Sequence, residues 1–489
     1  MKAVSQFDLF CSKLTGLVVL VVFFLVVSSK VIESGSLVKT LPGLIDDISI
    51  IFETGYIGVG EANDVQLFYY FVESEENPKN KPLMFMLSGG PGCSGLTKIL
   101  ANTGPYIFNY SNSTLENPVL ETNPYSWTKV ANIIAIDHPA GTGFSYAKTP
   151  EAYITNDTLA SKHAYQFLKK WLVEHPTFIN NELYVFGDSY GGLWVPMIVQ
   201  EIYNGNKREE EPHIKIKGYV LGNAVADTSD EYNTRIPFAH RVALLSDAIY
   251  KSTKENCYGE YLKIDPNNNP CMHDLHVVDK CLERINLQHV LEPYCDTSIN
   301  LKSTLLGRGL SSIEKTSMDF WSLPYIQMQR CQDNKTMYAT AWANRRDVQE
   351  ALHIHEEFNG NEWVGCNESL RFYYDKEPIS YTHNVLSNVD YHQHLTNKHC
   401  RALIYSGDHD MTVPYLSSLN WIELLSLLVI NDWRPWFVDE QVAGYTMKYS
   451  NHNYNLTFAT VKGGGHIAPD YKPKECLKML IRWLDDDVV

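Results

Sequence analysis

The residues GDSYG at positions 187–191 decide the fold because of what lies on either side of them. Residues 182–186, ELYVF, have the apolar and aromatic composition of a buried strand, and residues 193–203 have the spacing of a helix. A Gly-x-Ser-x-Gly sequence between a strand and a helix predicts a tight turn that projects a serine above the edge of a sheet. Ser189 is therefore the candidate nucleophile.

Strands and helices alternate around this motif over most of the chain. Strands are predicted at 65–71, 82–87, 131–137, 182–186, 216–221, 401–405 and 455–461, and a further helix at 156–174. This alternation predicts an α/β protein with a mixed, mostly parallel sheet covered by helices. It breaks between about residues 229 and 331, where helical patches, turn-rich segments and five cysteines occur. We interpret this stretch as a helical cap inserted into one domain.

Two later strand ends supply the partners that a serine nucleophile needs. Asp408 follows the strand at 401–405, and His466 follows the strand at 455–461 and a run of three glycines. A serine hydroxyl needs a neighbouring base, so His466 is expected to take its proton and Asp408 to orient the imidazole. Asp410 has two other interpretations, as a partner of His409 or as a helix cap.

The tetrahedral intermediate of acyl transfer needs two backbone donors for its oxyanion. The amide of Tyr190, directly after the nucleophile, is expected to be one of them. The second is expected from the glycine-rich loop at 88–93, SGGPGC, which follows the strand at 82–87.

Charge and the N-terminus limit the partners and the location. The chain of 489 residues carries a formal net charge of -16, which disfavours nucleic acid as a partner. Residues 17–27 form an apolar run that is too short for a bilayer core of about 30 Å, with basic residues before it and small ones after it. We therefore expect a signal peptide over 1–29 and a domain over 30–489. The mature protein is expected to be a monomer without a membrane contact, in the vacuole or outside the cell.

Cysteines and sequons agree with passage through the secretory pathway. There are ten cysteines, of which Cys11 lies in the leader, and disulfides are expected among the others. No Cys-x-x-Cys pair occurs, so a zinc site is not expected. No other metal and no cofactor is expected either. Sequons for N-glycosylation occur at Asn109, Asn112, Asn156, Asn334, Asn367 and Asn455.

Four motifs carry a resemblance to a known family. The segments GGPGCS at 89–94, PAGTGFSY at 139–146, GDSYGG at 187–192 and GN at 222–223 resemble the serine carboxypeptidase family, from about residue 40 to the C-terminus. The resemblance implies an α/β-hydrolase fold, the Gly90 amide as second oxyanion donor, and a triad of Ser189, Asp408 and His466. It also implies the disulfides Cys93–Cys366, Cys257–Cys271 and Cys295–Cys331, and leaves Cys281, Cys400 and Cys476 unassigned.

The chain departs from the peptidases of that family at two informative positions. Ser88 stands where they usually carry Asn, and Asp188 where they carry Glu, and both groups help to hold a peptide's terminal carboxylate. Ser88, Gly89 and Asp188 are therefore the candidate substrate-binding residues. The segments at 405–411, 431–436 and 463–469 are similar to the plant carboxypeptidase-like acyltransferases, which transfer an acyl group from a 1-O-glucose ester to an alcohol or amine.

The resulting hypothesis is acyl transfer from a small acyl-glucose donor to an alcohol or amine acceptor through an acyl-enzyme on Ser189. A bound acceptor can reach an effective molarity of about 10⁵ M, enough to compete with water at about 55 M. Two alternatives remain. One is a serine carboxypeptidase that removes C-terminal residues from peptides, and the other is a catalytically silent binding protein.

Overall fold

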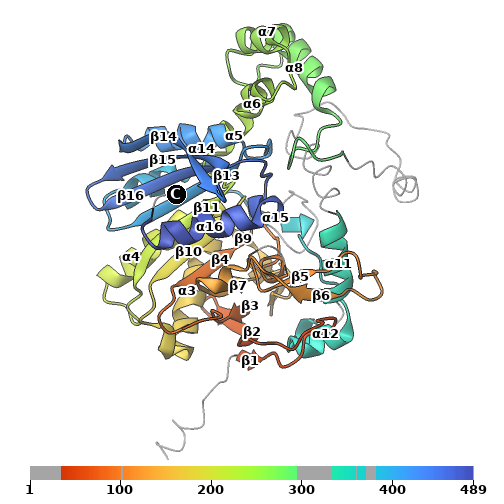
Figure 1. Cartoon of the computed structure of the whole chain (residues 1–489), viewed down its shortest axis with the longest axis vertical. Coiled ribbons are helices and arrows are strands. Elements are labelled where there is room, and N and C mark those ends of the chain that lie inside the picture. The colour runs from red at the N-terminus through yellow and green to blue at the C-terminus, as the bar shows by residue number, and fades with distance from the viewer. Residues whose placement is uncertain (1–34, 101–102, 295–332, 359–360, 371–380, 488) are drawn as a thin grey trace, which may run out of the picture.

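The computed structural model describes residues 35–100, 103–294, 333–358, 361–370, 381–487 and 489. Its centre is a 12-stranded sheet in the order β1-β2-β3-β7-β4-β10-β11-β13-β16-β15-β14, with β8 paired to β3 (Figure 1). The strands are β1 (Gly35–Leu37), β2 (Phe52–Val59), β3 (Val65–Val72), β4 (Leu83–Leu87), β7 (Asn132–Ile136), β8 (Tyr146–Ala147), β10 (Leu183–Asp188), β11 (Ile216–Gly222), β13 (Arg401–Gly407), β14 (Leu428–Val438), β15 (Gln441–Asn451) and β16 (Tyr454–Val461). Two small sheets pair β5 (Tyr106–Phe108) with β6 (Leu120–Thr122), and β9 (Thr155–Asn156) with β12 (Tyr381–Thr382).

The mixed sheet confirms the predicted fold class. Neighbouring strands from β7 to β16 run parallel, and the outer pairs on both sides run antiparallel. Each strand that the sequence predicts corresponds to a strand of this sheet. The long hairpin of β14 and β15 was not among the predictions. Because the central strands are parallel, their carboxyl ends meet at one edge of the sheet, and the candidate site lies there.

Helices cover both faces of the sheet, which is why its central strands are almost wholly apolar. The α-helices are α2 (Leu96–Ile99), α3 (Asp157–Glu174), α4 (Gly191–Lys207), α5 (Thr228–Asn233), α6 (Arg235–Arg241), α7 (Asp247–Cys257), α8 (Asn269–Leu282), α11 (Asp333–Ala343), α12 (Arg346–Ala351), α13 (Val389–Leu395), α14 (Tyr415–Leu424), α15 (Ala468–Tyr471) and α16 (Pro473–Leu484). Phe85 of β4 belongs to the core that contains residues of α3 and α4. Its neighbours Met84 and Met86 belong to the core on the other face, with residues of α16.

The described part of the predicted cap is helical. It begins with α5 directly after β11, and α6, α7 and α8 stand away from the sheet at one end of the molecule (Figure 1). The disulfide Cys257–Cys271 joins α7 to α8. Both helices contribute to a small core that also contains residues of α6 and, from the main body, Met411 and Leu416. The chain returns to the main body with α11 and α12, whose Trp342 and Val348 are completely buried. The second half of the predicted cap lies largely outside the described residues.

Two of the three expected disulfides are present. Cys93–Cys366 and Cys257–Cys271 are bonded as predicted, whereas Cys295 and Cys331 lie outside the described residues. Cys281, Cys400 and Cys476 form no disulfide with another described residue. The predicted signal peptide over 1–29 also lies outside the described part of the chain. Within that part, no helix has the length and apolar character needed to span a membrane.

Candidate active site

The nucleophile motif forms the predicted turn between β10 and α4. β10 ends at Asp188 and α4 begins at Gly191, so Ser189 sits in the turn itself, with a φ of 51°. A positive φ is uncommon for a residue with a side chain, and such strained conformations cluster at functional sites. A Cβ at Gly187 would lie 2.6 Å from the carbonyl oxygen of Gly191, so the turn can close only if residue 187 is glycine.

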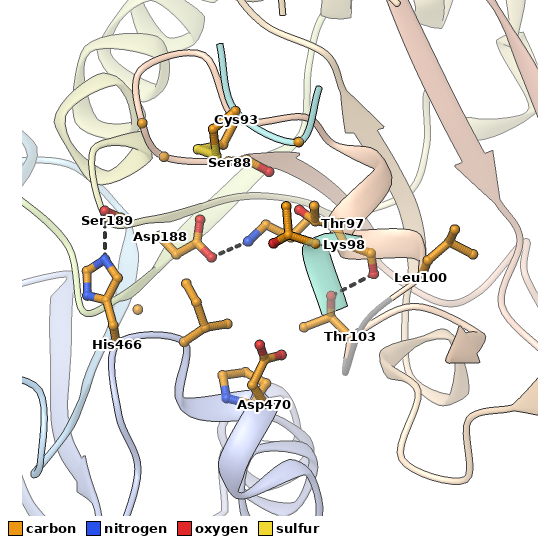
Figure 2. Close-up of a pocket in the computed structure, with 18 of the residues that line it drawn as sticks. Ser88, Cys93, Thr97, Lys98, Leu100, Thr103, Asp188, Ser189, His466 and Asp470 are labelled. Carbon is orange, nitrogen blue, oxygen red and sulfur yellow. Dashed lines mark hydrogen bonds and ion pairs between the residues drawn. A yellow bond between two sulfur atoms is a disulfide. The ribbon is translucent and has the colours of Figure 1, made fainter. Parts of the chain in front are cut away.

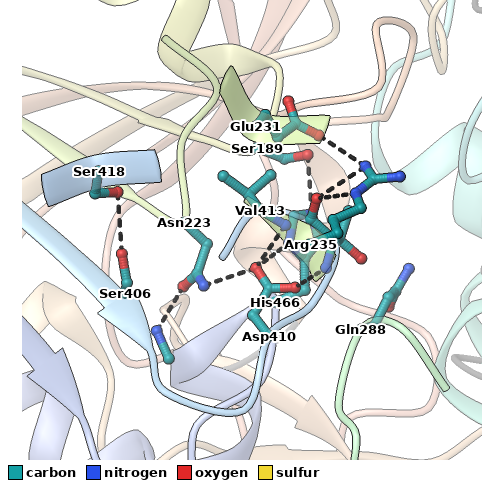
Figure 3. Close-up of polar contacts among 12 residues, drawn as sticks. Ser189, Asn223, Glu231, Arg235, Gln288, Ser406, Asp410, Val413, Ser418 and His466 are labelled. Atoms are coloured by element: carbon teal, nitrogen blue, oxygen red, sulfur yellow. Dashed lines mark hydrogen bonds and ion pairs between the residues drawn. The ribbon is translucent and has the colours of Figure 1, made fainter. Parts of the chain in front are cut away.

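Ser189, His466 and Asp410 form a hydrogen-bonded triad. His466 Nε2 lies 2.9 Å from Ser189 Oγ, and His466 Nδ1 lies 2.8 Å from Asp410 Oδ2 (Figure 3). A carboxylate only accepts, so Nδ1 carries the proton and Nε2 is left with the lone pair that faces the serine. Ser189 is 8% exposed, His466 5% and Asp410 0%. This arrangement activates a serine for attack on an acyl carbon.

The assignment of Asp408 to the triad is wrong. Its Oδ1 lies 2.6 Å from Nδ1 of His409 and accepts a hydrogen bond from the amide of Gly463, and its side chain is half-buried. Asp408 is the first residue after β13, and the chain then turns so that Asp410, two residues later, faces His466 instead. The position at a strand end correctly identifies the loop that carries the acidic residue of the triad. The conformation of that loop decides which of its two aspartates contacts His466.

Both sequence interpretations of Asp410 are corrected as well. His409 is paired with Asp408, and α14 begins only at Tyr415, after an N-cap at Pro414. Asp410 therefore neither holds His409 nor caps a helix. The signal that could have identified it is its position within Asp408–Asp410, where two acidic residues follow one strand.

Four donors hold Asp410 in place. Oδ1 accepts from the amide of Thr412 at 2.7 Å, and Oδ2 accepts from Nδ2 of Asn223 at 2.8 Å, from the amide of Val413 at 3.3 Å and from His466. Asn223 follows β11, and its Oδ1 accepts from the amide of Gly407 at 3.0 Å. Sequence reasoning assigned Asn223 no role, although the residue belongs to a quoted family motif.

The cap also contacts the triad through its backbone. The carbonyl oxygen of Gln288 accepts from the amide of His466 at 2.7 Å, and that of Leu287 accepts from the amides of Met411 and Thr412. These contacts place the described end of the cap directly against the two loops that carry the histidine and the aspartate.

The charges around His466 raise its pKa above the ordinary value. Burial disfavours the imidazolium, but the negative charges of Asp410, Asp188 and Glu231 outweigh it. Because the base must be neutral to accept the serine proton, the rate should fall as the pH drops through this raised pKa.

Replacing Asp188 by asparagine should shift the fall in rate on the acidic side of the pH profile, its acid limb, to lower pH. The change removes a negative charge that stabilises the imidazolium, so the pKa of His466 falls and the base stays neutral at lower pH. The pH dependence of Ser189 labelling by a fluorophosphonate measures this without a natural substrate. Asp408→Asn is the matched control because Asp408 bonds His409 and Gly463. An acid limb that stays in place in Asp188→Asn would contradict the assignment of the charge effect.

The glycine-rich loop lies directly against the nucleophile. A Cβ at Gly89 would come within 2.6 Å of Ser189 Cβ and 2.9 Å of the Tyr190 amide nitrogen. The next residue, Gly90, has a φ of 117°, a conformation that favours glycine. The loop carrying Gly90 is therefore beside the Tyr190 amide, as an oxyanion site built from these two amides requires.

A cavity of about 150 Å³ opens beside Ser189. Its lining includes the candidate substrate-binding residues Ser88, Gly89 and Asp188. It also includes Lys98, whose ammonium forms a buried ion pair with Asp188 (Figure 2). Its lining also contains polar side chains, among them Thr97 and Asp470. The larger apolar and aromatic side chains of the lining are Leu100, Phe108, Phe186, Trp363, Tyr405 and Ile467. Sequence reasoning missed Lys98, and its only signal was a basic residue just after the glycine-rich loop.

The predicted sequons differ in how their side chains are used. Asn112 and Asn455 are exposed. Asn109 Nδ2 donates to Glu121, Asn367 Nδ2 donates to the carbonyl of Gly141, and Asn156 caps α3. The side chain of Asn334 lies outside the described part of the chain. Exposure therefore favours Asn112 and Asn455 as acceptors of a glycan.

Comparisons with known proteins agree with this geometry. A sequence model described as serine carboxypeptidase matches residues 42–486. Serine carboxypeptidase-like 10 of Arabidopsis thaliana is 43% identical over 460 residues, which cover 94% of this chain and 96% of that protein. Serine carboxypeptidase-like 1 of the same organism is 43% identical over 469 residues, covering 95% and 96%.

A solved structure confirms the fold. The prohormone-processing carboxypeptidase Kex1(delta)p of Saccharomyces cerevisiae matches with a TM-score of 0.68, covering 93% of this chain and 96% of that one. At 19% identity this likeness supports the fold alone. It bears out the α/β-hydrolase architecture that the sequence motifs imply.

Proposed function

Because the chain belongs to the serine carboxypeptidase family, we propose that it is an acyltransferase that uses an acyl-enzyme on Ser189. The proposed donor is a 1-O-glucose ester, and the acceptor is a small alcohol or amine. The triad supports the chemistry that the whole family shares, whereas the residues beside the nucleophile support this choice of substrates.

Each step of the proposed reaction uses groups that the site contains. His466 Nε2 takes the Ser189 proton as Oγ attacks the ester carbonyl, and the Gly90 and Tyr190 amides stabilise the oxyanion. The bond between the acyl carbon and glucose O1 then breaks, and His466 returns the proton to the departing oxygen. The acceptor gives its own proton to His466 and attacks the acyl-enzyme. The bond between the acyl carbon and Ser189 Oγ then breaks, and His466 returns the proton to Oγ. This step releases the new ester or amide and restores Ser189.

The observation that carries the choice of donor is the ion pair of Lys98 and Asp188. By the family resemblance, Asp188 stands where the peptidases carry a Glu that helps to hold a substrate carboxylate. Its ion pair with Lys98 is buried beside the nucleophile. An ammonium in contact with a carboxylate offers a neutral pair with adjacent donors and acceptors, which suits the hydroxyl groups of a sugar. It leaves less unpaired positive charge for a peptide's terminal carboxylate.

Peptide hydrolysis is the second candidate. The Lys98 ammonium could also hold a terminal carboxylate if a substrate drew it away from Asp188, and the triad would form the same acyl-enzyme. The two functions then differ only in the second attacker, which is water in one case and the acceptor in the other. A silent binding role is disfavoured because the hydrogen bonds of His466 to both Ser189 and Asp410 are intact.

The proposed cellular location rests on the signal peptide that the sequence predicts. The protein would act in the vacuole or outside the cell as a monomeric glycoprotein, with small molecules rather than nucleic acid or membranes as its partners. The exposed Asn112 and Asn455 support glycosylation at those sites.

The deciding experiment incubates the purified full chain with a phenolic acid glucose ester and candidate alcohols, and separately with a blocked dipeptide. The proposal expects a transferred ester from the first mixture and no free amino acid from the second. Ser189→Ala should abolish product formation and serves as the background control. Release of C-terminal amino acids without any transferred ester would establish the peptidase alternative instead.

Lys98→Met should raise KM for the glucose ester about tenfold or more, since a charge-assisted hydrogen bond contributes about 1.5–3 kcal/mol. Steady-state kinetics with a series of donor concentrations measures the change. Lys251→Met is the control because Lys251 lies on α7 and its side chain is 77% exposed. If KM is unchanged in Lys98→Met, the ion pair no longer supports a sugar ester as the donor.

A further inference from the structure

A buried ion pair that the proposed reaction does not use lies beside the triad. Glu231 of α5 and Arg235 of α6 are joined at 2.9 Å between Oε1 and Nη2, and their side chains are 5% and 9% exposed (Figure 3). Removing two charges from water is costly, so such a pair alone is weak evidence for stability. What else the guanidinium contacts therefore matters.

Arg235 is connected to the catalytic carboxylate through a single peptide unit. Its Nε and Nη2 donate to the carbonyl oxygen of Thr412 at 3.1 and 2.9 Å. The N–H of that same peptide unit belongs to Val413 and donates to Asp410 Oδ2 at 3.3 Å. Since a trans peptide is planar, with its C=O and N–H on opposite sides, holding the carbonyl fixes the direction of the N–H.

The oxygen atom that accepts the hydrogen bond from Val413 is the same one that binds the catalytic histidine. Asp410 Oδ2 accepts from His466 Nδ1 at 2.8 Å and from Asn223 Nδ2 at 2.8 Å as well as from Val413. A cation on the carbonyl polarises the peptide and strengthens its N–H as a donor. Arg235 therefore affects Asp410 without direct contact, because it orients the Val413 N–H and strengthens the hydrogen bond that this N–H donates to the carboxylate.

We propose that Arg235 and Glu231 are positioning residues that hold Asp410 in its working orientation toward His466. Glu231 keeps the guanidinium aimed at the Thr412 carbonyl and balances its charge inside the protein. Because both residues lie on the first helices of the cap, the base of the cap sets the geometry of the aspartate loop. This inference goes beyond the proposed function, since it applies equally to acyl transfer and to hydrolysis.

The test measures the second-order rate at which a fluorophosphonate labels Ser189, which needs the triad but no natural substrate. Arg235→Met should slow labelling about 10²-fold, the effect expected when a catalytic group is misplaced by about 1 Å. Arg235→Lys keeps the charge and one donor nitrogen, and it should retain a rate within about tenfold of the parent. Arg241→Met on the same helix is the matched control, because Arg241 is exposed and bonds Tyr415.

A double-mutant cycle separates positioning from a general loss of structure. If Arg235 acts through Asp410, Arg235→Met should have little further effect, less than about twofold, in an Asp410→Asn background. The downfield proton resonance of His466 Nδ1–H should also weaken or shift in Arg235→Met and persist in Arg241→Met. Effects of Arg235→Met and Asp410→Asn that multiply, or a parental labelling rate in Arg235→Met, would overturn the proposal.

A second variant covers the case in which Arg235→Met fails to fold. Glu231→Leu combined with Arg235→Met leaves no unpaired buried charge, and circular dichroism with thermal melting reports whether it is folded. The Thr412 carbonyl still loses the two Arg235 donors in this variant, so labelling should remain at least about tenfold slower. A folded double variant that reacts at the parental rate would show that the pair serves only stability.

Discussion

Replacing Asp410 by asparagine should slow the reaction of Ser189 about 10⁴-fold, whereas replacing Asp408 should change it less than about threefold. The amide of the new residue presents a donor to His466 Nδ1, which favours the tautomer that has its proton on Nε2. That tautomer cannot accept the serine proton. Asp408 contacts His409 and Gly463, so its removal leaves the triad intact.

Fluorophosphonate labelling with intact-protein mass spectrometry measures both variants on one scale. His466→Ala and Ser189→Ala give the lower limits of the labelling rate, and thermal melting tests whether each variant is folded. If Asp408→Asn proved to be the inactive variant and Asp410→Asn the active one, the triad described by the structure would be wrong.

Gly89→Ala should lower the rate of acylation about 10³-fold, which is the upper range for the loss of one oxyanion donor. The new Cβ would lie 2.6 Å from Ser189 Cβ and 2.9 Å from the Tyr190 nitrogen, and both belong to the rigid elbow. The loop would have to move away and would take the Gly90 amide with it. Labelling kinetics and turnover of the donor ester both report this loss.

Gly259→Ala provides the control for adding a methyl group to a glycine. A Cβ at Gly259 meets nothing within 4 Å, although its φ of 78° makes the change mildly unfavourable. We expect a small loss of stability and an unchanged labelling rate in this variant. A Gly89→Ala protein that melts like the parent and labels at its rate would show that the loop is not packed against the nucleophile as described.

Strand and motif patterns were sufficient to predict the centre of the fold. The apolar runs at β4, β7 and β10 are buried on both faces, which gives a strong pattern, and the Gly187–Gly191 turn allows little besides glycine at its ends. Ser189 and His466 were predicted correctly as a contacting pair because each follows a strand of one parallel sheet.

The residues that sequence reasoning missed are all defined by contacts between distant segments. Asp408 and Asp410 are equivalent by spacing, and only the turn held by Thr412 and Asn223 distinguishes them. Arg235 reaches the site through a peptide group 177 residues away, and Lys98 through an ion pair across 90 residues. Neither contact follows from a periodic pattern, and a basic residue just after the glycine-rich loop is too weak a signal to identify Lys98 by itself.

The link between Cys93 and Cys366 has a consequence for how the protein must be made. The segment at 92–94 bonds with that at 365–367, so the loop that faces Ser189 is anchored to a part of the chain 273 residues further on. A ribosome must deliver about three-quarters of the polypeptide before this anchor can exist. Production in a reducing bacterial cytosol should therefore yield chains in which this loop lacks its covalent anchor, and an oxidising lumen is the suitable host compartment.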